Sequence, residues 1–226
     1  MIPNLPVYIS ITFLASVTYT YLIALKASQN HQAVRWGTLL WLVATAVPAF
    51  YGFFANTSTV PPRMPLLLAP SLIIILIAFA TTKGKAFIDS LDNKLLTWLS
   101  LVRIPVEICL FWLFLEGHVP QVMTFEGRNF DILAGATAPV VAYLYFNRKV
   151  LSKKLFLVWN VIGILLLVNI IVHAVLSVPS PIQQFGLEQP NVAILHFPFA
   201  WLASYVAPMV LFSHFVILRR LIKTKE

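Results

Sequence analysis

The stretch Arg103-Ile104-Pro105-Val106-Glu107 places a cation and a carboxylate four residues apart within an otherwise apolar run. A charge at the centre of a membrane helix costs roughly 2.5 to 3.5 kcal/mol on insertion scales, so such residues face a protein interior, pair, or line a hydrated path. Pro105 has no N–H to donate to the carbonyl of Leu101, so the helix is expected to bend there. We therefore expect Arg103 and Glu107 to face the inside of a helical bundle.

The composition around this stretch is that of a membrane protein. Apolar residues make up 59% of the chain, charged residues make up 11%, and the mean hydropathy is +0.85. Soluble proteins are typically about 45 to 50% apolar and about 25% charged. The lipid bilayer is therefore the expected surrounding, and residues 1–226 are expected to form a single transmembrane domain.

Seven segments approach the length of about 20 mainly apolar residues that a spanning helix needs. The expected fold class is therefore all-α, a polytopic bundle of seven transmembrane helices. The segments are approximately 7–25, 34–55, 65–82, 96–115, 132–146, 155–178 and 192–218.

Lysine and arginine predict how this bundle is oriented. Cytoplasmic loops carry an excess of these residues, and 13 of the 16 basic residues lie in alternate loops and the C-terminal tail. They are Lys26, Arg35, Lys83, Lys85, Lys94, Arg148, Lys149, Lys153, Lys154, Arg219, Arg220, Lys223 and Lys225. The N-terminus is thus expected outside and the C-terminus in the cytoplasm. Because the net charge of +8 follows the membrane segments in this way, no nucleic acid partner is expected.

Two further segments carry local expectations. The loop 83–94 can place its apolar residues on one face and is expected to form a short helix on the cytoplasmic membrane surface, with Asp89 as its N-cap. The segment 132–146 contains many small residues, among them Ala134, Gly135 and Ala138, and is expected to pack closely against its neighbours.

The most polar loop, between the fourth and fifth segments, contains Glu126-Gly-Arg-Asn-Phe-Asp131. Asn129 or Asp131 would suit a helix N-cap, and Gly127 would suit a tight turn. We expect a polar cavity that opens to the outer face between the fourth to seventh segments. Its candidate solute- or ion-binding residues are Arg103, Glu107, Glu126, Arg128, Asn129, Asp131 and Asn169.

Three function classes remain open. In the first, the protein is a transporter or channel for a small solute or ion, Glu107 exchanges a proton or binds a cation, and Arg103 holds Glu107 in place. The second is a membrane enzyme that uses a metal or haem on a lipophilic substrate, and the third is a structural or sensory component in which Arg103 and Glu107 only lock the bundle. An oligomer is compatible with each of them.

Metal or haem ligation would fall to the outer histidines His118, His173 and His196. Their spacing matches no motif that places two imidazoles on one helical face, so no cofactor is predicted. His214 is expected to lie alone at the inner end of the last segment. Every lysine is in a cytoplasmic loop or tail, which excludes a retinal Schiff base in the bundle.

The segments Arg103-Ile-Pro-Val-Glu107 and Glu126-Gly-Arg-Asn-Phe-Asp131, the latter followed by Ile-Leu-Ala-Gly, resemble those of a group of uncharacterised bacterial integral membrane proteins of similar length. The resemblance covers roughly the second half of the chain. It implies a bacterial membrane setting and carries no activity with it. The inner (plasma) membrane is the expected location.

Overall fold

The computed structural model describes residues 2–56 and 63–223, and this part of the chain is helical without a β-strand. The long helices are α1 (Val7–Ala27), α2 (Gln32–Phe50), α3 (Pro65–Ala80), α4 (Thr82–Ser90), α5 (Asn93–Leu99), α6 (Arg103–Leu115), α7 (Asp131–Ala142), α8 (Lys153–Leu176) and α9 (Ala207–Lys223). Short 3-10 turns cover Ser100–Val102, Gln121–Met123 and Ala193–Leu195, and π-helices cover Tyr143–Asn147 and Leu202–Val206. The expectation of an all-α protein is confirmed.

Five helical stretches in the described ranges are long and apolar enough to cross a membrane, as a membrane protein requires. They are Val7–Ala27, Gln32–Phe50, Asn93–Leu115, Lys153–Leu176 and Leu202–Lys223. A sixth arises if α3 and α4, which meet at an angle of 94°, are counted together. The remaining expected segment, 132–146, corresponds to α7, whose 12 residues are fewer than the roughly 20 of a straight crossing.

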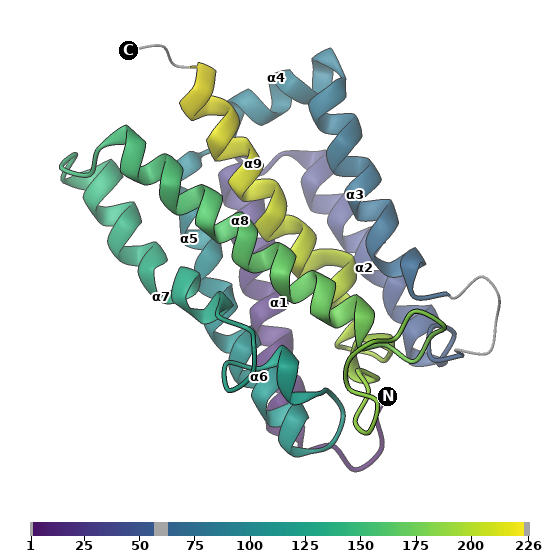
Figure 1. Cartoon of the computed structure of the whole chain (residues 1–226). Coiled ribbons are helices and arrows are strands. Elements are labelled where there is room, and N and C mark those ends of the chain that lie inside the picture. Colours follow the sequence, from purple (N-terminus) through teal and green to yellow (C-terminus); the bar gives the residue numbers. More distant parts are fainter. Residues whose placement is uncertain (1, 57–62, 224–226) are drawn as a thin grey trace.

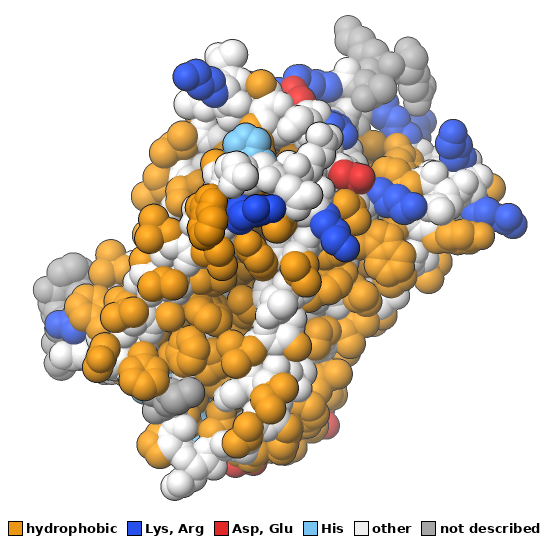
Figure 2. Space-filling view, turned by 180° about the vertical axis from the view of Figure 1, so that it is seen from behind, with side chains coloured by type: hydrophobic (Ala, Val, Ile, Leu, Met, Phe, Trp, Pro, Cys, Tyr) orange, Lys and Arg blue, Asp and Glu red, His pale blue; other side chains and the backbone are white. Residues whose placement is uncertain are grey.

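The helices form one bundle, with the N-terminus at its lower end and the C-terminus at its upper end (Figure 1). Most Lys and Arg side chains on the face shown in Figure 2 gather at the upper end, above a broad band of hydrophobic side chains. Large exposed apolar residues occur on many of the helices, for example Leu40, Leu76 and Leu165. A band of apolar side chains next to a basic end is the surface expected of a protein that spans a bilayer.

Helix α4 is the short helix expected in the loop 83–94, and it meets the end of α3 at an angle of 94°. Its apolar face is buried at Ile88. The expectation that Asp89 caps this helix is wrong, because the cap is Thr81, whose side chain accepts a hydrogen bond from the N–H of Gly84. Asp89 instead lies near the helix C-terminus, where it forms ion pairs with two basic residues of α9, Arg219 and Lys223.

The packing of α6 against α7 brings the charged stretch into the bundle. A 3-10 turn at Ser100–Val102 joins α5 to α6 just before Pro105, where the missing N–H disturbs the regular α-helical pattern. A Cβ atom at Gly135 would lie 3.1 Å from the Cβ of Arg103, so only a small residue allows α7 to approach this closely. The expected close packing of the small residues is confirmed.

A proline in α9 fixes the positions of α2 and α3. Pro208 cannot donate to the carbonyl of Ser204 four residues earlier, and this part of the chain is π-helical. The free carbonyl accepts hydrogen bonds from the indole N–H of Trp41 in α2, at 2.8 Å, and from the hydroxyl of Ser71 in α3, at 2.5 Å. One buried carbonyl thus links the last helical stretch to α2 and α3.

Candidate functional site, a buried polar row

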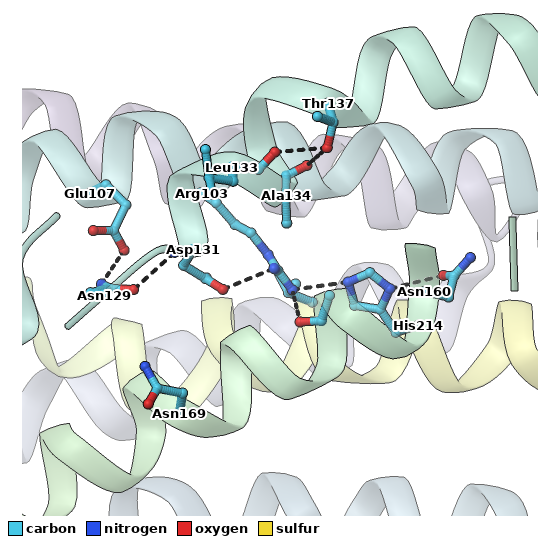
Figure 3. A network of polar contacts seen from close by, with 12 residues as sticks. Arg103, Glu107, Asn129, Asp131, Leu133, Ala134, Thr137, Asn160, Asn169 and His214 are labelled. Carbon is cyan, nitrogen blue, oxygen red and sulfur yellow. Dashed lines mark hydrogen bonds and ion pairs between the residues drawn. The ribbon is translucent and has the colours of Figure 1, made fainter. Parts of the chain in front are cut away.

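Six polar side chains lie in a row inside the bundle, and each is at most 4% exposed. This polar row consists of Glu107, Asn129, Asp131, Arg103, His214 and Asn160, and Figure 3 shows them in that order. They come from α6, the loop before α7, α7 itself, α8 and α9. Buried polar groups are costly unless they are hydrogen-bonded, so the partners of each one decide what the row can do.

Arg103 is paired with Asp131 rather than with Glu107. Its Nη1 lies 2.9 Å from Oδ1 of Asp131, and both side chains are almost fully buried. The other terminal nitrogen, Nη2, donates to the carbonyl of Gly163 at 3.0 Å. The expectation that Arg103 holds Glu107 directly is therefore wrong, because α7 brings a second carboxylate within reach of the guanidinium.

His214 is neutral, as its neighbours in the row require. Nη2 of Arg103 lies 2.9 Å from Nε2 of His214, and a guanidinium can only donate, so Nε2 must accept. The proton of the ring is then on Nδ1, which lies 2.9 Å from Oδ1 of Asn160. The amide nitrogen of Asn160 in turn donates to the carbonyl of Phe156 at 2.8 Å. The hydrogen bonds from Arg103 to Asn160 are thus assigned, and His214, which was expected to lie apart from the outer histidines, has Arg103 and Asn160 as its partners.

The other half of the row, from Glu107 to Asp131, is organised by Asn129. Its amide nitrogen donates to Oε1 of Glu107 and to the carbonyl of Met123, and its oxygen accepts from the backbone N–H of Asp131. Asn129 therefore binds the first backbone N–H of α7 and holds Glu107 at the same time. The N-cap position itself is Phe130, so the expectation that Asn129 or Asp131 is the N-cap is wrong. The second carboxyl oxygen of Glu107, Oε2, is buried and has no hydrogen-bond partner among the described residues.

Two glycines let the chain approach the row closely. A Cβ at Gly163 would lie 2.6 Å from Cε1 and 2.8 Å from Nε2 of His214, so a larger residue would push the imidazole away from Arg103. A Cβ at Gly127 would lie 2.1 Å from the carbonyl oxygen of Gln121. The expected tight turn at Gly127 is confirmed, and it brings Asn129 back toward Glu107.

A cavity of about 70 Å³ adjoins the centre of the row. Arg103, Glu107 and Asp131 line it together with apolar residues of α3, α6, α8 and α9. A cavity of this size has room for a few water molecules, which need polar partners to be stable there. Oε2 of Glu107 and Nε of Arg103 are both buried without a partner in the described part of the chain, and both belong to side chains that line the cavity.

The remaining expected site residues lie nearer the surface. Glu126 and Arg128 are exposed, and the guanidinium carbon of Arg128 is 6.0 Å from the ring centre of Phe185. Asn169 donates from its amide nitrogen to the backbone carbonyl of Arg128 at 2.8 Å. Asn169 therefore connects the polar loop to α8. Of the seven expected site residues, the structure brings four into the row, namely Arg103, Glu107, Asn129 and Asp131.

The outer histidines are bonded to local backbone groups. His173 and His196 each place Nδ1 near the carbonyl four residues earlier, at 2.8 and 3.0 Å. Burial lowers the pKa of His118 and outweighs the opposing effect of Glu116. Across the described residues, no three His, Cys, Asp or Glu side chains come together in an arrangement that would hold a metal ion.

Two members of the row, Asn160 and His214, and the close approach at Gly163 were not among the expected site residues. Asn160 and His214 are polar residues in segments expected to span the membrane, and such a residue is itself a signal. The sequence did not show which of these residues meet, because the 3-10 turn Ser100–Val102 and the π-helix Leu202–Val206 interrupt the regular helical spacing before α6 and α9.

Comparison with known proteins adds the family but no activity. Residues 61–222, which include the whole polar row, match the family described as domain of unknown function DUF8737, and the chain belongs to this family. No curated protein and no solved structure matches the chain.

Proposed function

We propose that this member of the DUF8737 family is an integral protein of the bacterial inner membrane that moves a proton or a small cation, with Glu107 as the exchanging group. The observation that carries the proposal is Oε2 of Glu107, which is buried without a partner on a side chain that lines a cavity. A carboxyl group in that position can take up and release a proton or bind a cation without breaking its bond to Asn129.

The charges of the row support this proposal. Arg103 supplies one positive charge and forms an ion pair with Asp131, so the charge of Glu107 is not balanced by an ion pair of its own. An unpaired charge is very costly in a low-dielectric interior, and it is avoided when the carboxylate holds a proton or a bound cation. The row thus combines a structural pair with one carboxyl group that is free to exchange.

The proposed topology has seven crossings with the N-terminus outside. It is supported by termini at opposite ends of the bundle and by basic side chains gathered at the end that holds the C-terminus (Figures 1 and 2). In this orientation Glu107 belongs to the outer half of the row, and His214 and Asn160 belong to the inner half. Glu126, Arg128 and Asn169 then belong to the outer surface, where a solute would enter.

Proton flux into liposomes tests the role of Glu107. The purified protein is reconstituted with a trapped pH-sensitive dye, and a potassium diffusion potential drives protons inward. Wild-type protein is expected to raise the flux above that of empty liposomes, and Glu107→Gln is expected to reduce it to the background because glutamine cannot exchange a proton.

Glu116→Gln is the matched control, because Glu116 is an exposed residue just after the same helix. It should leave the flux unchanged. Circular dichroism and thermal unfolding show whether Glu107→Gln still folds, and Glu107→Asp provides a second variant that keeps the carboxyl group. An equal flux in folded Glu107→Gln and wild type would exclude the proposed role, and so would a wild-type protein that gives no proton flux and no flux of Na⁺ or K⁺.

A further inference from the structure

A second and larger cavity, of about 320 Å³, lies away from the polar row between α1, α2, α3 and α9. Residues of α4 and α5 also contribute to its lining. The described residues that line it include none with a charge, and most of them are apolar. Its size falls within the lower part of the range found for small-molecule sites, and such sites are mostly apolar with a few well-placed polar groups.

The polar groups of this cavity come from the π-helix Leu202–Val206. Ser204 is 0% exposed and Tyr205 is 4% exposed, and both residues line the cavity. Their hydroxyl groups are buried and make no hydrogen bond of good geometry within the described residues. Single-turn π-helices are frequent at functional sites, and here two adjacent residues of the π-helix that carry hydroxyl groups line one cavity.

The rest of the site is rigid. The carbonyl of Ser204 accepts hydrogen bonds from Trp41 and Ser71, and these bonds hold α2 and α3 on two sides of the cavity. The indole N–H of Trp41 and the hydroxyl of Ser71 are therefore occupied, while the hydroxyls of Ser204 and Tyr205 lack a hydrogen bond of good geometry. The side chain of Thr38 in α2 lines the same cavity and lies within reach of the Tyr205 hydroxyl, but the two groups are not well aligned for a hydrogen bond.

We infer that this cavity is a binding site for a neutral lipophilic molecule with a hydroxyl or carbonyl head group. The head group would bond with the hydroxyls of Ser204 and Tyr205, which would otherwise leave two buried groups unsatisfied. The apolar body would lie against the surfaces of α2, α3 and α9. A charged head group is excluded because no lining side chain could balance its charge.

Photolabelling in liposomes tests the inference with a decanol that carries a diazirine on its chain. Labelled peptides are expected to come from the cavity segments of α2, α3 and α9. Excess 1-decanol should compete with the label, and excess decane should compete far less because it has no head group. The loss of one hydrogen bond in Tyr205→Phe should weaken labelling by roughly three- to tenfold.

Two further variants keep the test decisive. Tyr51→Phe is the matched control, since Tyr51 is 81% exposed and does not line the cavity, and its labelling should equal that of wild type. Ser204→Ala is the second variant if Tyr205→Phe fails to fold. Labelling spread evenly over the lipid-facing helices would overturn the inference. It would also be overturned if decane competed as well as decanol and both variants labelled like wild type, because the cavity would then hold only acyl chains.

Discussion

Arg103 determines the direction of the hydrogen bonds along the inner half of the polar row. Because a guanidinium only donates, its contact with Nε2 of His214 requires the neutral Nδ1–H form of the ring, and that form in turn donates to Asn160. Protonation of His214 would place two donors face to face. The bonds among Arg103, Asp131 and His214 therefore hold these side chains in fixed positions. Glu107, in contrast, keeps one carboxyl oxygen without a hydrogen bond.

The sequence predicted part of this arrangement. The cost of burying Arg103 and Glu107 predicted that both face inward, and the motif that ends at Asp131 supplied two more members of the row. The pairing itself could not be read from spacing, because residues at i and i+4 on a helix are neighbours by default. A third charge from α7 competes for Arg103, and only the tertiary structure shows that Asp131 forms the ion pair.

Gly163→Ala tests whether the bond between His214 and Arg103 stabilises the protein. The added Cβ would lie 2.6 Å from Cε1 of His214, so the ring must move and its bond to Arg103 is lost. Overpacking of this kind costs about 1 to 3 kcal/mol, which exceeds the helix-propensity gain of about 0.5 to 1 kcal/mol for replacing glycine by alanine. We expect a lower unfolding temperature in detergent, measured by circular dichroism.

Gly37→Ala is the matched control, because Gly37 lies in α2 and a Cβ there would meet no atom within 4 Å. This variant should be as stable as wild type or slightly more stable. If the two alanine variants unfolded at the same temperature, the close contact between Gly163 and His214 would not exist in the protein.

At the scale of single elements, prolines decide where the helices change character. Pro105 follows the 3-10 turn that opens α6, and Pro208 frees the carbonyl to which α2 and α3 are bonded. The sequence predicted a disturbance of the helix near Pro105 because the missing N–H is a local property, and the structure has a 3-10 turn just before it. It did not predict the π-helix before Pro208, because the partners of the free carbonyl come from helices far away in the chain.

Helix α4 is held at its C-terminal end by the basic residues of α9. Hydrogen bonds from Lys223 and then Arg219 lower the pKa of Asp89 below its usual value of 3.8. A carboxyl group whose pKa is lower in the folded protein adds stability above the pKa of the unfolded chain, and it loses this contribution as the pH falls through the folded value. Acid should therefore loosen α4 from α9.

Spin labels at Lys85 and Ile222 measure this loosening as a broader distance distribution at acidic pH. The change should remain partial, because Arg220 also donates to the backbone carbonyl of Asp89, which does not titrate. Asp89→Asn should show a broad distribution at every pH. A narrow distribution in Asp89→Asn at neutral pH would contradict the role of the ion pairs.

At the scale of the whole molecule, hydrophobicity and charge predicted the membrane class and the positions of the helices. The expected segments coincide with α1, α2, α3, the joined α5 and α6, α7, α8 and the last helical stretch, with shifted ends. Helix α7 has only 12 residues, but the π-helix Tyr143–Asn147 continues it over the rest of the expected segment 132–146. The polar row depends on how these helices meet, which hydropathy does not encode.

The proposed transport role depends on seven crossings with the N-terminus outside, and cysteine accessibility measures this topology most directly. In a Cys109→Ser background, single cysteines replace Asn4, Lys94, Glu116 or Lys149, and an impermeant maleimide is added to intact cells. The account predicts labelling at positions 4 and 116 and no labelling at positions 94 and 149 until the membrane is permeabilised. Labelling of positions 94 or 149 in intact cells, or protection of position 116, would contradict it.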